Sequence, residues 1–406
     1  MSKRVWLALS AFVASFAAQA ADEPQWLKEA RAREGKIGAA VAIKSKDNWF
    51  SAKLPAKLVG DIEKVEGSYT IELDIGGDQS AYCEVTPDGF DMADMIRTNL
   101  EFTMEQVGKT QGKVEVRALE ATDAGVFGKV PFLQTQWIYR VNDGKAQMLG
   151  GFQQISMVKD GQGIYCAHVD LGYTKTFRAV AKAFAETFES TAEGPAPFYE
   201  EIAVTTLGGR KLGISRITLE RDADGDIKVN DTNAALRPVA DGVLHSEDII
   251  RLEWVRPDYS LINATRFVAQ DGALTSNLEI KVVGDHWTVE GEHDGKKLNQ
   301  KLKTDAQPGT WLAQANGIRK MLANADSVGS AHAMWYWLGS IPDTLVETKM
   351  KVTAKAGARK FKGVATLEGI NADVIIDQDS GTVVVAEVKA NGMEMTFERV
   401  YAKGTF

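Results

Sequence analysis

The second half of the chain is best understood from residues 260–302, SLINATRFVAQDGALTSNLEIKVVGDHWTVEGEHDGKKLNQKL. They contain four runs with strand-like composition, 260–269, 274–283, 286–290 and 296–302. The turns between these runs are Asp271-Gly272, Gly284-Asp285 and Asp294-Gly295. Asp and Gly suit the positive φ angles of tight hairpin turns, so the stretch predicts an antiparallel meander.

The pattern continues on both sides of this meander. A strand is expected over 208–220, and further strands are expected to begin near Leu345, Lys360, Ala372, Thr382 and Met393. Two helical pieces interrupt the strands. The first follows the N-cap Thr310 and carries Trp311, Ala315, Ile318 and Leu322, with Gly317 in its interior. The second follows Ser330 and carries Met334, Trp335 and Leu338.

This half resembles the half-barrel of periplasmic lipoprotein carriers. The resemblance rests on the strand 208–220, the meander 260–302 and the helical insert 311–338. It implies a curved sheet that wraps helices around an apolar concavity, and it implies no catalytic residues.

The first half mixes strands and helices. Strands are expected over 68–75, 80–85, 113–119, 133–141, 146–156 and 163–169. Helices are expected over 24–34, behind Asp91, and around the apolar stripe of Phe177, Val180, Ala181, Phe184 and Phe188. Within it, residues 132–188, with Gly151-Phe152-Gln153-Gln154 and the turn Asp160-Gly161, resemble the PsbP-like fold. That resemblance implies an accessory or assembly role.

The sequence therefore predicts the α+β class: an N-terminal antiparallel sheet with packed helices, then a long antiparallel sheet with a helical insert. Residues 1–20 read as a signal peptide cleaved before Ala21, since a basic start precedes an apolar run and Ala18-Gln19-Ala20. The first domain is expected over 21–189, a Pro/Gly-rich linker over 190–198, and the second domain over 199–406. These features predict a periplasmic protein without a transmembrane anchor.

Charge and cysteine content narrow the function classes. The net charge of −8 argues against a nucleic-acid partner. In an oxidising compartment Cys83 and Cys166 favour one disulfide, and two buried thiols are the alternative. No cofactor or metal is expected, because Asp222–Asp226 lacks the ligand positions of a calcium loop and the histidines lack zinc spacing. No local signature of a nucleophile occurs, so an enzyme is the less favoured class.

Two sets of residues are candidates for binding. Aromatic residues of the helical insert either fill a core or line an apolar ligand cavity: Trp311, Trp335, Tyr336 and Trp337. Lysines at period two are expected on one face of a hairpin: Lys349, Lys351, Lys355, Lys360 and Lys362. That basic face is either simply solvated or docks an acidic partner or a lipid headgroup.

The leading hypothesis is a non-catalytic binding or envelope-assembly protein that takes an apolar molecule, a lipid or a protein partner. A periplasmic hydrolase with catalytic residues scattered in the sequence is one alternative. A purely structural interaction module is the other.

Overall fold

The chain divides into two compact units. A computed structural model describes residues 25–192, 197–239, 242–324, 326–390 and 393–406. The first unit comprises Met1–Gly194 and Leu236–His245, and the second comprises Pro195–Ala235 and Ser246–Phe406. The predicted signal peptide, residues 1–20, and the centre of the predicted linker, residues 193–196, lie outside the described residues.

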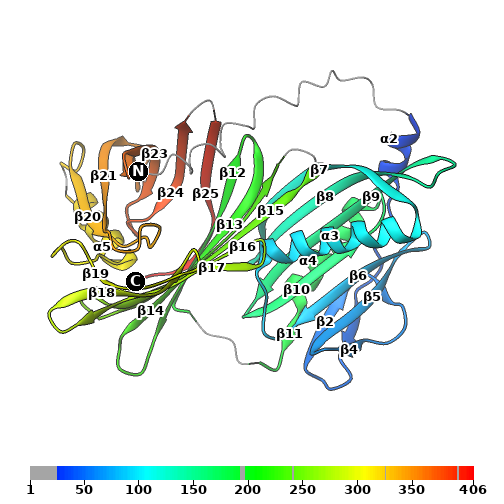
Figure 1. The fold of residues 1–406 in the computed structure, drawn as a ribbon, viewed down its shortest axis with the longest axis horizontal. Coiled ribbons are helices and arrows are strands. Elements are labelled where there is room, and N and C mark those ends of the chain that lie inside the picture. The colour runs from blue at the N-terminus through cyan, green and yellow to red at the C-terminus, as the bar shows by residue number, and fades with distance from the viewer. Residues whose placement is uncertain (1–24, 193–196, 240–241, 325, 391–392) are drawn as a thin grey trace. The chain divides into compact units, whose positions relative to one another are not determined.

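The first unit contains two antiparallel sheets (Figure 1). Its helices are α2 (Gln25–Ala32), α3 (Met92–Thr110) and α4 (Thr174–Thr187). Its strands are β1 (Val41–Lys44), β2 (Phe50–Leu54), β3 (Lys57–Leu58), β4 (Glu63–Val65), β5 (Ser68–Gly76), β6 (Gln79–Thr86), β7 (Lys113–Phe127), β8 (Val130–Asn142), β9 (Gln147–Lys159), β10 (Gln162–His168) and β11 (Glu189–Ser190). The larger sheet has the order β3-β5-β6-β10-β9-β8-β7, with β4 paired to β5, and the smaller has the order β1-β2-β11.

The core of this unit lies between the larger sheet and α4. Phe177, Val180 and Phe184 of α4 pack with residues of β2, β5, β6 and β10. Helix α3 contacts β7, β8 and β9. In β8 and β9 successive residues are buried, as expected for strands covered on both faces.

The predicted disulfide is confirmed. Cys83 on β6 lies directly opposite Cys166 on β10, and the two are joined by an S–S bond. Both side chains are fully buried in the core of the first unit. A tyrosine precedes each cysteine, so the crosslink falls at equivalent places on two neighbouring strands.

The second unit is one antiparallel sheet with a single helix among its described residues, α5 (Trp311–Leu322). Its strands are β12 (Tyr199–Leu207), β13 (Arg210–Arg221), β14 (Ile227–Pro238), β15 (Leu244–Val255), β16 (Leu261–Gln270), β17 (Ala273–Val283), β18 (His286–His293), β19 (Lys296–Lys301), β20 (Ala331–Tyr336), β21 (Val346–Lys355), β22 (Lys360–Leu367), β23 (Ile370–Asp377), β24 (Val383–Ala390) and β25 (Met393–Gly404). The order is β19-β18-β17-β16-β15-β14-β13-β12-β25-β24-β23-β22-β21-β20 (Figure 1). The predicted meander is confirmed as β16 to β19.

The predicted α+β class is wrong, because strands make up 57% of the structure and helices 15%. Part of the error lies at Ser330–Leu338, which was expected to be helical. Residues 331–336 instead form β20, in register with β21, and their burial alternates with period two. The helical spacing of Met334, Trp335 and Leu338 was too short a pattern to distinguish a helix from an edge strand.

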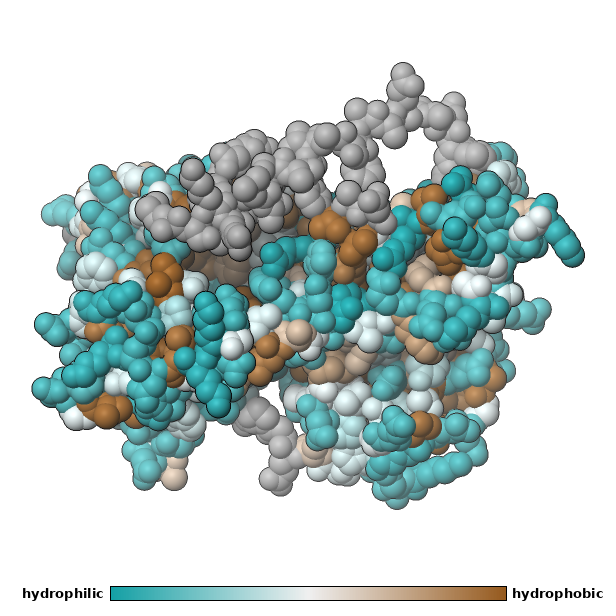
Figure 2. Space-filling view, in the orientation of Figure 1, coloured by the Kyte–Doolittle hydropathy of each residue, from teal (hydrophilic) through white to brown (hydrophobic). Residues whose placement is uncertain are grey.

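Hydrophilic residues cover most of the described surface seen in Figure 2, with small apolar patches between them. Among the described residues, no helix combines the length and the apolar character needed to cross a membrane.

Candidate functional site

Helix α5 lies against one face of the second unit's sheet, which we call the α5-bearing face. The predicted cap is confirmed, since the Thr310 hydroxyl accepts a hydrogen bond from the Ala313 amide at 3.0 Å. Leu312 packs with Ile217 and other residues of β12 to β15, whereas Ile318 packs with Val374 and other residues of β21 to β23. The helix therefore touches two separate parts of the same sheet, so the sheet must curve around it.

Two glycines allow α5 and the segment before it to approach β20 closely. A Cβ atom on Gly317 would lie 2.2 Å from Cε1 of His332, and one on Gly309 would lie 2.1 Å from Sδ of Met334. Glycine in a helix interior weakens the helix by about 1 kcal/mol relative to alanine. In the structure Gly317 accommodates the imidazole ring of His332, so α5 is closely docked on β20.

Gly317→Ala is therefore expected to destabilise the second unit by about 1–3 kcal/mol, despite the higher helix propensity of alanine. The added methyl group must displace the His332 ring. Urea unfolding measures the change, and the double variant Gly317→Ala/His332→Ala should recover most of the loss. A stabilised single variant would show that α5 does not press on β20.

Glu253 on β15 anchors the beginning of α5. Its Oε2 accepts a hydrogen bond from the Trp311 amide at 2.9 Å, and its Oε1 accepts one from the Tyr336 hydroxyl at 2.7 Å. Nη2 of Arg251 lies 2.8 Å from the same Oε1. Only 1% of the Glu253 side chain is exposed. A carboxylate at a helix N-terminus is favourable, so this buried charge has a clear structural role.

Further charged groups surround this ion pair on the α5-bearing face. The Arg251 guanidinium lies 4.0 Å from the centroid of the Tyr336 ring. Burial raises the pKa of Asp231 on β14 to about 6, although Arg251 opposes this shift. Burial also raises the pKa of Tyr336 well above its ordinary value, so its hydroxyl remains a donor. We call Asp231, Arg251, Glu253, Arg266 and Tyr336 the charged cluster.

Arg251 and Arg266 are the least satisfied members of the charged cluster. They are direct cross-strand partners on β15 and β16, and like charges in this position repel each other. Arg251 is 7% exposed, yet its Nε has no hydrogen-bond partner among the described residues. For Arg266, the described part of the chain provides no hydrogen bond or ion pair, and burial lowers its pKa. The cluster therefore retains unused capacity to bind an anion.

An apolar strip lies on the same face, on β24 and β25. Phe397 is opposite Ala386, and Ala386 packs against the core cluster that contains Ile318 of α5. Phe397, Ala386 and Val388 are all only partly buried. Phe397 pairs with Thr205 on β12, which pairs with Gly213 on β13, which pairs in turn with Ala235 on β14. Asp231 is on this same strand, so three strand spacings, about 14 Å, separate the apolar strip from β14, and five spacings, about 24 Å measured along the curved sheet, separate it from Arg266 on β16.

The predicted aromatic set is not brought together in one cavity wall. Trp311 packs against Tyr199 and Phe406. Trp337 is fully buried among residues of β16 to β18, and its Nε1 donates to the Pro342 carbonyl at 2.8 Å. Trp335 is 46% exposed, next to the inward-pointing Tyr336 on β20. Only Tyr336 belongs to the charged cluster.

The five lysines of the predicted basic face are all exposed. Four of them lie on the sheet face opposite α5, but Lys355 does not. A register shift between Val352 and Ala354 places Lys355 opposite the buried Phe361. The same face of the sheet also carries Asp373, which pairs with Val364 opposite Lys351. A β-bulge thus breaks the expected period of two. In addition, Asp373 lowers the net positive charge of this face.

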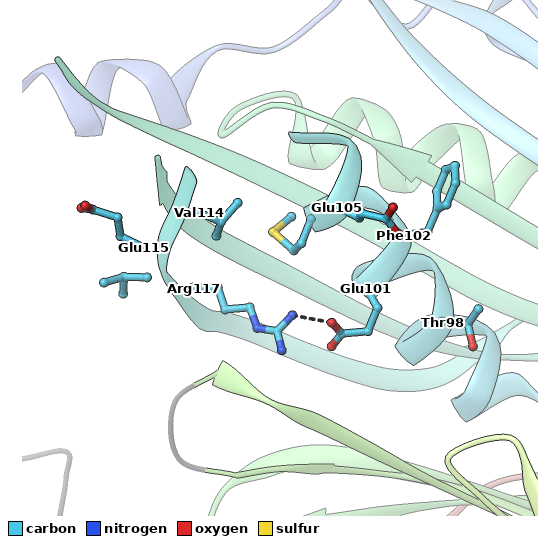
Figure 3. Close-up of a pocket in the computed structure, with 9 residues that line it drawn as sticks. Thr98, Glu101, Phe102, Glu105, Val114, Glu115 and Arg117 are labelled. Carbon is cyan, nitrogen blue, oxygen red and sulfur yellow. Dashed lines mark hydrogen bonds and ion pairs between the residues drawn. The ribbon is translucent and has the colours of Figure 1, made fainter. Parts of the chain in front are cut away.

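A groove of about 810 Å³ lies between α3 and β7 in the first unit (Figure 3). Phe102 and Val116 are exposed there, and Arg117 pairs with Glu101 at 2.9 Å. Glu105 pairs with Lys109, and Glu115 lies 3.6 Å from Arg140. Because each charge in the groove has a partner within the protein, nothing there calls for an ionic ligand.

Few local patterns in the sequence point to the charged cluster. Ile249, Arg251, Glu253 and Val255 share one face of a strand, and this alternation of apolar and charged side chains is the available signal. Asp231 and Arg266 come from two other strands. Only the sheet brings them together.

Comparison with known proteins adds little. No family model matches the chain, and no curated protein matches it. One similar structure is a β-barrel-like protein of the domain-of-unknown-function family DUF1849 from Brucella abortus, with 10% identity, a TM-score of 0.39, and coverage of 52% of this chain and 98% of that one. Another is a DUF1089 family protein from Pseudomonas aeruginosa, with 12% identity, a TM-score of 0.26, and coverage of 48% and 92%. TM-scores this low do not establish a shared fold, and neither match supports the PsbP-like or lipoprotein-carrier resemblance.

Proposed function

We propose that the chain is a non-catalytic binding protein whose second unit takes a molecule with an apolar chain on the α5-bearing face. The observation that carries this proposal is the apolar strip of Phe397, Ala386 and Val388. Ala386 packs against the core around α5, Phe397 lies opposite Ala386, and all three side chains are only partly buried. Covering them with an apolar chain removes that surface from water, which contributes roughly 25 cal/mol per Å².

The curvature of the sheet supports the same proposal. Tyr336, at the end of the edge strand β20, donates a hydrogen bond from its hydroxyl to Glu253 on β15. Trp337, just after this strand, packs with Leu278 and Val289 of β17 and β18. The edge of the sheet thus curls back over its other half, and the α5-bearing face becomes concave. A concave, largely preformed surface is the usual setting for a small ligand.

The alternatives account for less of the structure. A hydrolase needs a nucleophile and a base in contact, whereas the charged cluster consists of an ion pair that anchors α5. The hypothesis of a purely structural module does not explain why the apolar strip is partly exposed or why donors of Arg251 and Arg266 have no partner among the described residues. We therefore rank both below a binding protein.

We further propose that the protein acts outside the cytoplasm, in the periplasm. The buried disulfide supports this location, because such bonds persist in oxidising compartments and are rare in the cytosol. The basic start, apolar run and small-residue site in residues 1–20 favour the same route.

Equilibrium dialysis of the full chain against labelled dodecanoate tests the proposed function. Phe397→Glu should weaken binding at least tenfold, because it places a charge in the apolar strip. Thr396→Glu is the matched control: it adds the same charge at the preceding residue, whose side chain points to the opposite face of β25. This control should bind normally. Native protein that retains no dodecanoate, or a Phe397→Glu variant that binds as well as the control, would reject the proposal.

A further inference from the structure

We infer that the charged cluster is an anion subsite, so that the ligand is an amphipathic acid: an apolar chain ending in a carboxylate or a phosphate. This inference rests on the proposed function, since the chain of the ligand would occupy the apolar strip. It adds the chemical class of the headgroup and names Arg266 and Arg251 as the residues that select it.

The first support is the arrangement of the two arginines. Arg251 and Arg266 are direct cross-strand partners, and two cations in such positions repel each other. Arg251 is more than nine-tenths buried, and its Nε donor has no partner among the described residues. Buried polar groups without partners are rare, so an unused donor here needs an explanation. An anion between the two guanidinium groups satisfies the donor and relieves the repulsion.

The second support is that the nearby carboxylates engage few of the donors of the two arginines. Glu253 pairs with Arg251 only through Nη2 of the guanidinium. The two carboxylate oxygens of Glu253 also accept hydrogen bonds from the Trp311 amide and the Tyr336 hydroxyl. Asp231 is the other carboxylate near Arg251, and burial raises its pKa to about 6. Arg266 has no ion-pair partner in the described part of the chain, although Glu247 acts on it from a distance. At neutral pH Asp231 and Glu253 therefore balance the charges of Arg251 and Arg266, and what remains for an anion is the set of guanidinium donors that these carboxylates do not engage.

The third support is the position of Arg266. A Cβ atom on Gly339 would lie 2.8 Å from Cδ of Arg266 and 3.3 Å from Cζ2 of Trp337. The positive φ of 70° at this glycine is a conformation that most side chains avoid. The stem of Arg266 thus lies against the tight turn at Gly339, and this leaves its planar guanidinium group for bidentate contacts with a carboxylate or phosphate.

Three probes test the inference in the same dialysis experiment. Dodecanoate and dodecanol share a chain and differ in charge, and dodecyl phosphate replaces the carboxylate with a phosphate. The native chain should bind at least one of the two acids about tenfold or more tightly than the alcohol. The better acid identifies whether the subsite is shaped for a carboxylate or for a phosphate.

Arg266→Met should abolish this preference by weakening the acids to the level of the alcohol, while the affinity for the alcohol stays within about twofold. Arg266→Lys keeps the charge and should retain part of the preference. The double variant Lys349→Met/Lys351→Met is the matched control, because it removes cations from the opposite face. Coincident unfolding curves for the four proteins show that the fold is intact.

Three results would overturn the inference. In the first, the native chain binds dodecanol as tightly as the acids, in which case the proposed function stands and the anion subsite does not. In the second, the preference for the acids survives Arg266→Met but disappears in Lys349→Met/Lys351→Met. That result would assign the headgroup to the opposite face of the sheet. In the third, none of the probes binds, and the proposed function fails together with the inference.

Discussion

Replacement of Glu253 with alanine is expected to destabilise the second unit by about 3–5 kcal/mol. The change leaves Arg251 as a buried charge without its ion-pair partner. It also removes the acceptors of the Trp311 amide and the Tyr336 hydroxyl, so that α5 loses its anchor on β15. An unpaired buried charge is far more costly than a missing apolar contact, which is why this substitution should have one of the largest effects in the chain.

Urea unfolding followed by tryptophan emission measures the effect, and the two units are best fitted as separate transitions. Glu394→Ala serves as the matched control, because it breaks an exposed pair with Lys389 and should change stability by less than about 0.5 kcal/mol. A loss below about 1 kcal/mol for Glu253→Ala would mean that the cluster relaxes or admits water, contrary to the buried geometry described above.

Removal of the disulfide should have a comparable effect on the first unit. The double variant Cys83→Ala/Cys166→Ala is expected to lose about 4 kcal/mol, since the bond links residues 83 apart in sequence and restricts the unfolded chain. Alanine keeps the Cβ atoms and leaves no reactive thiol. Thermal unfolding with and without a reductant measures the change. The reductant should lower the transition of the first unit and leave that of the second unit unchanged, because both cysteines belong to the first unit.

Thiol titration of unfolded, unreduced protein provides the direct check on the disulfide. No reactive thiol should be found. Two titratable thiols would remove both the bond and the support that it gives to a location outside the cytoplasm.

Local sequence signals were enough to predict much of the secondary structure. Asp271 and Asp294 adopt positive φ angles of 50° and 49° before their glycines, as their Asp-Gly turns predicted. Thr310 caps α5 because its hydroxyl reaches an amide three residues ahead, a contact contained within one helical turn. In these cases the residues that determine the conformation are neighbours in the sequence.

Errors arose where the conformation depends on a distant partner. Residues 331–336 become a strand because β21 offers them an edge, and Trp335 consequently points away from Tyr336. Lys355 leaves the predicted basic face because a bulge shifts the register after Val352. A bulge adds one residue to a strand without a distinctive local motif, so periodicity alone could not place this lysine.

The candidate site was harder to predict than the fold. Arg266 becomes notable only because Arg251 lies opposite it, and the register of the sheet fixes that relation. The apolar strip likewise depends on Phe397 and Ala386 facing each other across β24 and β25. Composition and spacing identify the residue types that a site requires, but not which strands come together.

Native mass spectrometry of the full chain tests directly whether the α5-bearing face holds an amphipathic ligand. The protein is purified from the cell envelope without detergent, and its ligand is then extracted and identified. We expect a complex heavier than the polypeptide alone, which releases an acid with an apolar chain, and we expect Phe397→Glu to carry much less of it than Thr396→Glu. A bare polypeptide mass, unchanged after incubation with dodecanoate, would mean that the α5-bearing face holds no such ligand.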